Sequence, residues 1–351
     1  MIRAPLALAG EDVSRLVSEV LDEYGAATQR VARNYLPGQQ RAPFLDDLIA
    51  DYPSRGGKMM RPSICIANAC AFGGRIEHAA QCAAAIEILH NGLLIHDDIQ
   101  VGSELRRGRP TLHQLHGVPL AINAGDAMML LALRPLLDGL RPLSPSIAER
   151  ILEITQTMGR ETAEGQALEL GWRDQPAADV CEADYLTMVL KKTSWMAMIW
   201  PAQIGVLIGS NGEADPSNVA RFGFFLGAAF QIEDDLRNFE ESSTYGKELN
   251  GDLYEAKRTL MLIHARRASN STERRALDSF LALKREERTV ESVRWVADLM
   301  RRHGSLRYGR TMAQAMAGAA LHEFAAAYGA LPASRDKSFL AALATWVFTR
   351  Q

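Results

Sequence analysis

Two Asp-Asp pairs, each at the end of a mostly apolar helical stretch, are the first residues whose type and spacing indicate chemistry. Asp97 belongs to the first pair and Asp234 to the second. At helical spacing, Asp97 shares a face with Ile86, His90 and Leu93, and Asp234 shares a face with Gly227, Gln231 and Asn238. Each pair therefore directs a carboxylate toward a position where a core residue is expected.

For a single pair, capping a helix or meeting an arginine would be a sufficient explanation. Two pairs, about 140 residues apart, are harder to explain in that way. Carboxylates that face each other inside a bundle repel unless a cation lies between them. Mg²⁺ suits such a site because it keeps several waters and joins one or two carboxylates to a substrate phosphate. The metal-binding candidates are Asp97, Asp98, Asp234 and Asp235, and the expected ligand is a phosphate or diphosphate.

Basic residues support this interpretation because they gather near the carboxylates in the sequence. Any one of them could be a solvated surface charge. As a group they favour a pocket for a polyanion. The group consists of Lys58, Arg61, Arg106, Arg107, Lys192, Lys247 and Lys257.

The elements that must position these residues are helices. Turn-forming residues separate segments of roughly 15 to 30 residues that carry apolar side chains at three- and four-residue spacing. No alternating strand pattern, linker or internal repeat divides the chain. We therefore expect an all-α fold with one domain over residues 1–351.

Composition excludes several other classes of protein. The 39 Lys and Arg nearly balance the 42 Asp and Glu, for a net charge of −3, which argues against nucleic acid as a partner. With 47% hydrophobic residues the chain can bury a large core. The four cysteines form no C-x-x-C pair, and the most apolar stretch, Trp195 to Gly209, is too short to span a bilayer. We expect a cytoplasmic enzyme without a transmembrane segment.

In these residues the chain resembles the trans-isoprenyl diphosphate synthases, the family of farnesyl, geranylgeranyl and polyprenyl diphosphate synthases. Seven segments carry the resemblance, in family order over residues 50–265. They read GGKMMRP, EILHNGLLIHDD, ELRRGRPT, KKTSW, GAAFQIEDD, YGKELNGDL and AKRTL.

The resemblance implies an isoprenoid-synthase-type helical bundle with a central cavity, usually a homodimer. It implies a prenyltransferase that joins isopentenyl diphosphate to an allylic diphosphate through an allylic carbocation, with three Mg²⁺ ions when substrate is bound. The implied catalytic residues are Asp97, Asp98, Arg106, Lys192, Asp234 and Lys247. The allylic diphosphate would be bound by Arg106, Lys192, Thr193, Gln231, Lys247 and Lys257, and isopentenyl diphosphate by Lys58, Arg61, His90 and Arg107.

The sequence departs from the family where the first motif, DDxxD, reads DDIQV. Val101 replaces the last aspartate, so the site loses a ligand and a negative charge. Gln100 could offer a carbonyl oxygen, which is a weaker ligand. In the second motif Asn238 replaces the last aspartate but keeps an oxygen.

Three functions stay open at this point. The chain could elongate prenyl diphosphates, act on one allylic diphosphate as a terpene cyclase or lyase, or serve as a non-catalytic subunit of a heteromeric synthase. The complete isopentenyl diphosphate set favours elongation. In the family, a bulky residue five positions before the first aspartate limits product length. Gly92 occupies that position here, followed by Leu93, so we expect room for geranylgeranyl diphosphate.

Overall fold

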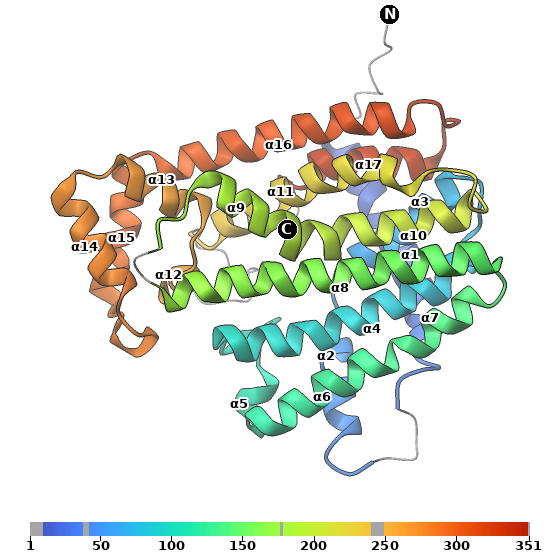
Figure 1. The fold of residues 1–351 in the computed structure, drawn as a ribbon, viewed down its shortest axis with the longest axis horizontal. Helices are drawn as coiled ribbons and strands as arrows, with labels where there is room; N and C mark the ends of the chain where they lie inside the picture. Colours follow the sequence, from blue (N-terminus) through green and yellow to red (C-terminus); the bar gives the residue numbers. More distant parts are fainter. Residues whose placement is uncertain (1–9, 38–41, 176–177, 240–248, 350–351) are drawn as a thin grey trace, which may run out of the picture.

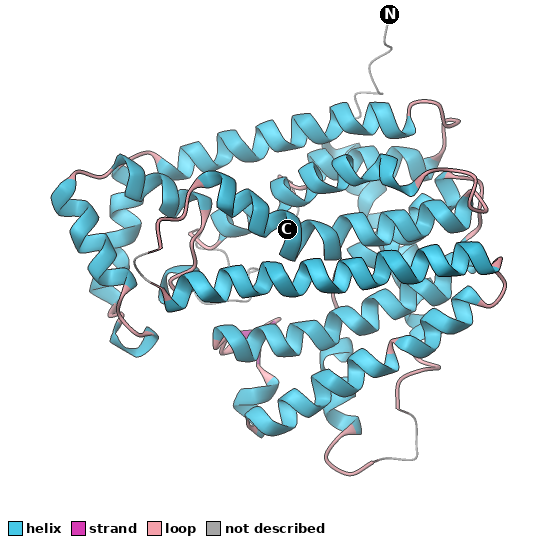
Figure 2. Ribbon diagram, in the orientation of Figure 1, coloured by secondary structure: helices cyan, strands magenta, loops and turns pink. Residues whose placement is uncertain are grey.

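The computed structural model describes residues 10–37, 42–175, 178–239 and 249–349, and these residues form an all-α fold, as the sequence predicts (Figures 1 and 2). The helices of the first half are α1 (Gly10–Ala32), α2 (Asp46–Ser54), α3 (Met60–Ala71), α4 (Ile76–Val101), α5 (Leu112–His116), α6 (Val118–Leu131), α7 (Leu133–Leu140) and α8 (Pro145–Asp174). Those of the second half are α9 (Glu182–Val189), the π-helix η1 (Leu190–Ile199), α10 (Trp200–Gly209), the 3₁₀-helix η2 (Pro216–Val219), α11 (Ala220–Arg237), α12 (Gly251–Tyr254), α13 (Leu260–Ala268), α14 (Ser271–Leu281), the 3₁₀-helix η3 (Arg285–Glu287), α15 (Val290–Arg302), α16 (Ser305–Tyr328) and α17 (Arg335–Trp346).

Helix α4 is the central element of the first half. It contacts α1, α3, α6, α7 and α10, so its apolar residues lie on all sides instead of along one stripe. Small residues such as Ala83, Ala84 and Ala85 are buried along it and let the neighbouring helices approach closely. The C-terminal end of α4 carries the first Asp-Asp pair, which is therefore held from several directions.

The second half is organised around α11, which packs on α16 and η1. A separate cluster of buried apolar residues joins α11 to the C-terminal helices α13 to α16. Leu226 of α11 belongs to the main cluster around α3, α4 and α10, whereas Ile232 belongs to the C-terminal one. Helix α11 therefore connects the two clusters. That residues 1–351 form one domain stays a prediction.

The segment that carries KKTSW is a π-helix, whereas the sequence pattern predicts only an ordinary helix. Glycines of the two neighbouring helices receive its wide turns. A Cβ atom on Gly165 of α8 would lie 2.3 Å from the Lys192 backbone nitrogen, and one on Gly227 of α11 would lie 2.3 Å from Ser194 Oγ. π-Helical turns occur frequently at functional sites, and this one sets the direction of Lys192 and Thr193.

A short hairpin follows α4, although the sequence predicts no strand. Strands β1 (Leu105–Arg106) and β2 (Arg109–Pro110) pair antiparallel across Arg107 and Gly108. Both turn residues have positive φ, 53° and 73°, as a type I′ turn requires. The hairpin fixes two adjacent arginines, Arg106 and Arg107, beside the end of α4.

One apolar helical stretch, Val118–Leu140 across α6 and α7, reaches the length and hydropathy of a membrane span, which the sequence analysis did not single out. Its mean hydropathy is 1.4, and 39% of the residues in its most apolar window are buried. By itself this is weak evidence for a membrane, because core helices of soluble proteins reach the same values.

The close approach of α8 to η1 predicts unequal effects of two glycine substitutions on α8. Gly165→Ala should lower the free energy of unfolding by about 1–3 kcal/mol, because the new methyl group meets backbone. Gly159→Ala is the matched control. Nothing lies within 4 Å of a Cβ there, so the change should be neutral or raise stability by up to about 1 kcal/mol. Urea denaturation of both variants measures the difference, and equal stabilities would contradict the packing described.

Candidate active site

A cavity of about 320 Å³ lies where the end of α4, the hairpin, α8, η1 and α12 meet. It brings together four of the predicted site residues, Asp97, Arg106, Lys192 and Lys257. The charged residues on its wall are five carboxylates and four cations. They are Asp97, Glu104, Glu169, Asp252 and Glu255, with Arg106, Lys192, Lys257 and Arg285.

Asp97 is the carboxylate of the first motif that faces this cavity. Its Oδ1 accepts hydrogen bonds from Lys192 Nζ at 3.2 Å and from Gln166 Nε2 at 3.1 Å. Arg106 Nη2 lies 3.5 Å from its other oxygen. The Gln166 amide also donates to Gln100 Oε1 at 2.7 Å, so the oxygen that could replace a missing ligand is already engaged.

Asp98, the second carboxylate of the same pair, is completely buried and does not line the cavity. It accepts hydrogen bonds from the Tyr52 hydroxyl and from Arg106, whose Nε lies 2.9 Å from Oδ1. Burial, together with the nearby carboxylate, raises the pKa of Tyr52, so the hydroxyl stays a donor. In this arrangement Asp98 holds Arg106 in place.

Asp235 of the second pair repeats this arrangement. It is buried, and it accepts hydrogen bonds from Tyr185 at 2.9 Å, Gln231 at 2.9 Å and Lys257 at 2.8 Å. A tyrosine and a cation thus hold the second carboxylate of each pair. Thr193 donates to Gln231 at 2.7 Å and links this group to η1.

Glu169 and Gln166 are site residues that sequence reasoning missed. Both come from α8, three residues apart and therefore on one face. Buried Glu169 accepts from Lys192 at 2.8 Å. Burial disfavours both charged forms, but opposite charges outweigh it: Asp97 and then Glu169 raise the pKa of Lys192, and Lys192 and then Lys257 lower the pKa of Glu169. The only sign of Glu169 in the sequence was a glutamate inside a helical stretch, and this does not distinguish a site residue from a surface residue.

The residues expected to bind isopentenyl diphosphate, Lys58, Arg61, His90 and Arg107, do not line this cavity and are described as a second group. Burial lowers the pKa of Arg61 to about 10, Arg107 adds repulsion, and Glu87 and Asp234 oppose both effects. Burial and the same arginines also lower the pKa of His90 well below its usual value, so His90 is neutral at neutral pH. The charges of Arg61 and Arg107 thus act on His90, and the charge of Asp234 acts on Arg61.

Backbone carbonyls orient Arg107, and an aromatic ring faces Lys58. Arg107 Nη1 donates to the carbonyl oxygens of Tyr52, at 3.1 Å, and of Gly56. The exposed Lys58 ammonium lies 5.4 Å from the centre of the Trp346 ring. Lys58 therefore stands at the outer edge of this group.

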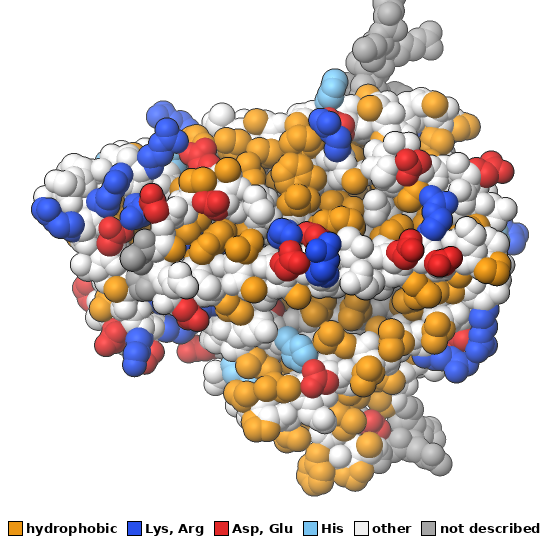
Figure 3. Space-filling view, viewed as in Figure 1, with side chains coloured by type: hydrophobic (Ala, Val, Ile, Leu, Met, Phe, Trp, Pro, Cys, Tyr) orange, Lys and Arg blue, Asp and Glu red, His pale blue; other side chains and the backbone are white. Residues whose placement is uncertain are grey.

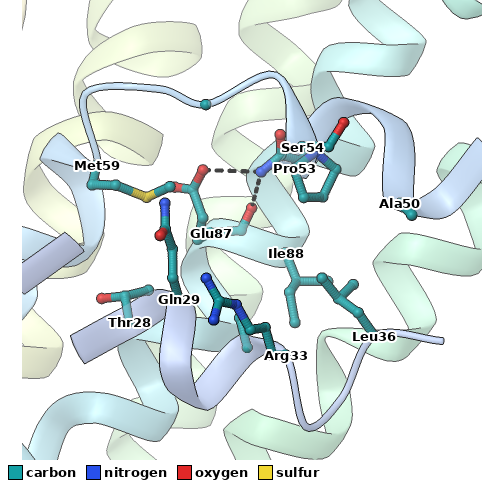
Figure 4. A pocket seen from close by; sticks show the side chains of 13 residues that line it. Thr28, Gln29, Arg33, Leu36, Ala50, Pro53, Ser54, Met59, Glu87 and Ile88 are labelled. Carbon is teal, nitrogen blue, oxygen red and sulfur yellow. Dashed lines mark hydrogen bonds between the residues drawn. The ribbon is translucent and has the colours of Figure 1, made fainter. Parts of the chain in front are cut away.

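A second cavity, of about 340 Å³, lies between α1, α2 and α4, and Glu87 is one of the residues that line it (Figure 4). Figure 4 shows Glu87, Gln29 and Arg33 around it, with Met59 at one side. Asn91 Nδ2 donates to the Glu87 carboxylate at 2.9 Å. Burial raises the pKa of Glu87, and Arg61 opposes that rise. Glu87 thus connects this cavity to the arginines of the second group.

The sequence predicts that Gly92 leaves room for a long product, but in this structure α6 packs closely against Gly92. A Cβ at this position would lie 3.0 Å from the Gly125 carbonyl oxygen and 3.1 Å from Met128 Cβ. The missing side chain lets α4 and α6 approach closely, so α6 fills the space. Leu93 is half-buried against the main core cluster. Another predicted site residue, Lys247, lies outside the described residues.

Among the described residues, no group of three or more His, Cys, Asp or Glu side chains could hold a metal ion. Val101 contributes to this result because it replaces the third carboxylate of the first motif. The Asn238 Oδ1 is occupied as well, since it accepts from the Asp252 backbone nitrogen at 3.0 Å. The donor set fits Mg²⁺ held by one or two carboxylates together with a substrate phosphate. It does not fit a cage made of protein ligands alone.

The two carboxylates of the first pair should respond differently to neutralisation. Asp98→Asn should lower the free energy of unfolding by about 3 kcal/mol or more, because Arg106 loses its buried partner. Asp97→Asn should cost less than about 1 kcal/mol, because Asp97 is partly solvated and its cations keep other partners. Denaturation curves of both variants test this, and similar losses would refute the distinction.

Comparisons with known proteins show to which family the chain belongs. Residues 42–300 match the model of the polyprenyl synthetase family. The short chain isoprenyl diphosphate synthase of Methanothermobacter thermautotrophicus is 34% identical over 260 residues, which cover 74% of this chain and 77% of that protein. The geranylgeranyl diphosphate synthase of Saccharolobus solfataricus is 29% identical, over 88% of this chain and 89% of that protein.

Solved structures give the same result. The geranylgeranyl pyrophosphate synthetase of Pyrococcus horikoshii superposes with a TM-score of 0.83 at 27% identity, over 96% of this chain and 99% of that one. A polyprenyl synthase of Caulobacter crescentus, solved with calcium and isoprenyl diphosphate, also has a TM-score of 0.83, at 26% identity over 96% and 98%. The chain belongs to the polyprenyl synthetase family.

Proposed function

We propose that this protein is a trans-prenyltransferase that condenses isopentenyl diphosphate with an allylic diphosphate, with geranylgeranyl diphosphate as the product. The observation that carries the proposal is the convergence of Asp97, Arg106, Lys192 and Lys257 on one cavity, beside a second group of cations. Two groups of cations suit two diphosphates. A protein that binds a single phosphate compound would have no use for the second group.

The first group suits the allylic diphosphate and its departure. Arg106, Lys192 and Lys257 are fixed by carboxylates before substrate binds, so their charges need little rearrangement as the diphosphate leaves. Mg²⁺, when bound, supplies further positive charge to the leaving group. Asp97 and Asp234 are the residues that would hold it, with Asp98 and Asp235 behind them.

The second group suits the diphosphate of the acceptor. Arg61 and Arg107 supply charge, and neutral His90 can donate or accept a hydrogen bond. Separate groups for the two diphosphates position the acceptor alkene beside the allylic carbon, which converts the reaction into a positioned, effectively unimolecular step.

The product assignment rests on relatives. Proteins named geranylgeranyl diphosphate synthase recur among them, at 29% identity in Saccharolobus solfataricus and 32% in Sulfolobus acidocaldarius. A relative from Rhodobacter capsulatus, 36% identical over 62% of this chain, is named all-trans-nonaprenyl-diphosphate synthase, so the family includes much longer products. Met128, packed over Gly92, favours the shorter product, because a longer chain following α4 would have to displace it.

Product analysis tests the proposal. The purified protein is incubated with Mg²⁺ and dimethylallyl, geranyl or farnesyl diphosphate, with and without isopentenyl diphosphate. We expect linear products ending at geranylgeranyl diphosphate only when isopentenyl diphosphate is present, and at least about a hundredfold lower rate for Asp97→Asn. Hydrocarbons or alcohols from an allylic diphosphate alone would point to a cyclase or lyase. The absence of any product at high Mg²⁺ would point to a non-catalytic subunit.

We further propose a cytoplasmic homodimer that pairs through α5, α6 and α7. Exposed apolar side chains follow helical spacing along α6 and α7 and form one stripe, made of Val118, Ile122, Leu130, Leu133 and Leu137, and Leu115 on α5 and Leu120 on α6 are exposed as well. Figure 3 shows hydrophobic side chains gathered over α5 and α6. An exposed patch of this kind marks an interaction surface. The four free cysteines suit a reducing compartment.

A charge inside the stripe should break the dimer. Leu133→Glu would bury a carboxylate in the interface, and we expect a shift from dimer to monomer in sedimentation velocity. Leu152→Glu is the control, since Leu152 is an equally exposed leucine on α8 outside the stripe. A Leu133→Glu variant that stays dimeric would show that the subunits pair elsewhere.

A further inference from the structure

Arg173 lies next to one end of the first cavity. At this end Val101 stands where the first motif of the family has its third carboxylate. Arg173 Nη2 donates to the Val101 carbonyl oxygen at 3.3 Å. On α8, Arg173 lies seven residues after Gln166 and four after Glu169, so all three share one face. Gln166 contacts Asp97, and Glu169 contacts Lys192. The same face of α8 therefore directs a cation to the position of Val101.

Arg173 differs from the other cations at this end of the cavity in its partners. Arg106, Lys192 and Lys257 each have a carboxylate partner. In the part of the chain that the structure describes, Arg173 has no carboxylate partner, and its buried Nη1 has no hydrogen-bond partner. A guanidinium atom removed from water without an acceptor is costly unless a ligand supplies one.

A further arginine, Arg288, is near enough to both Arg173 and Arg285 to be affected by their charges. Arg285 lines the cavity, and the pKa of buried Arg288 is lowered, first by burial and then by the charges of Arg173 and Arg285. Arg288 donates to the backbone carbonyl oxygens of Tyr254, at 2.6 Å, and Leu283, so it is fixed in the protein. Three guanidinium groups near one another attract an anion to this end of the cavity.

Arg173 adjoins the cavity wall at Val101, whose carbonyl oxygen it contacts, and is not itself one of the wall residues. An aspartate at position 101 would add a carboxylate within reach of Arg173. Because Val101 stands there instead, the guanidinium has no acidic side chain of the first motif to neutralise it.

We propose that Arg173 is a diphosphate-binding residue, and that its guanidinium contributes at the Val101 end of the cavity the positive charge that a carboxylate-bound Mg²⁺ ion would otherwise bring. The ligand is the diphosphate group of the allylic substrate, which becomes the released pyrophosphate. This inference rests on the proposed function. It predicts that the chain binds a diphosphate measurably without Mg²⁺.

Calorimetric titration of the full chain with inorganic pyrophosphate, in a buffer with EDTA and no metal, tests the inference. We expect the wild type to bind and Arg173→Met to bind at least about tenfold more weakly, since a charge-assisted hydrogen bond is lost. Arg173→Lys should recover part of the affinity. Arg160→Met is the control, because Arg160 is an exposed arginine of the same helix paired with Glu161.

The competing explanation is that Arg173 only caps the C-terminal end of α4. In that case Arg173→Met would lower the melting temperature and leave pyrophosphate binding unchanged, which would overturn the inference. Wild-type protein that does not bind pyrophosphate without metal would also overturn it. Neither result bears on elongation, which the product analysis tests separately.

A substitution at Val101, the residue that Arg173 contacts, tests the inference independently. Val101→Asp places a carboxylate beside Arg173, so metal-free pyrophosphate binding should weaken about as much as in Arg173→Met, and binding should depend more steeply on Mg²⁺. Unchanged metal-free binding would contradict the inference. Titration with geranyl diphosphate in the same buffer separates two supporting outcomes. If Arg173→Met binds both ligands more weakly, Arg173 binds the substrate. If it binds only pyrophosphate more weakly, Arg173 binds the leaving group.

Discussion

The structure depends on two carboxylates that are removed from water and hydrogen-bonded by their neighbours. Each belongs to an Asp-Asp pair, and each is held by a tyrosine hydroxyl and a cation: Tyr52 and Arg106 at Asp98, Tyr185 and Lys257 at Asp235. A buried carboxylate without these partners would be very costly. The same contacts orient Arg106 and Lys257 toward the cavity. The contacts that satisfy a buried carboxylate thus also build part of the charged wall of the cavity.

Features encoded by local sequence patterns could be predicted, whereas features that depend on tertiary packing could not. The helical fold followed from apolar periodicity, and the grouping of Asp97, Arg106, Lys192 and Lys257 followed from the order of the motifs. The sequence could not predict which aspartate of each pair is buried and binds a cation. Two adjacent aspartates are equivalent in sequence, and only the packing of the surrounding helices distinguishes them. Glu169 was missed for a similar reason, since its burial comes from its position against η1.

Backbone irregularities were beyond sequence reasoning. The composition of Leu190–Ile199 suits an ordinary helix, and its π-helical turns depend on Gly165 and Gly227 on two other helices. Gly92 shows the same limit. A glycine can leave space for a ligand or let a neighbouring helix approach, and only the position of α6 decides between them. These are tertiary effects that one segment of sequence does not contain.

The type I′ turn at Arg107 and Gly108 has a consequence for how the two substrates interact. It places consecutive arginines in different groups, Arg106 with Asp98 and Arg107 with the Tyr52 and Gly56 carbonyls. Tyr52 joins them again, because its hydroxyl binds Asp98 while its carbonyl receives Arg107. If the two groups bind the two diphosphates as proposed, a hairpin that shifts when one diphosphate binds would change the affinity for the other. Affinity for the two substrates should be thermodynamically linked, with the coupling carried by a turn of four residues.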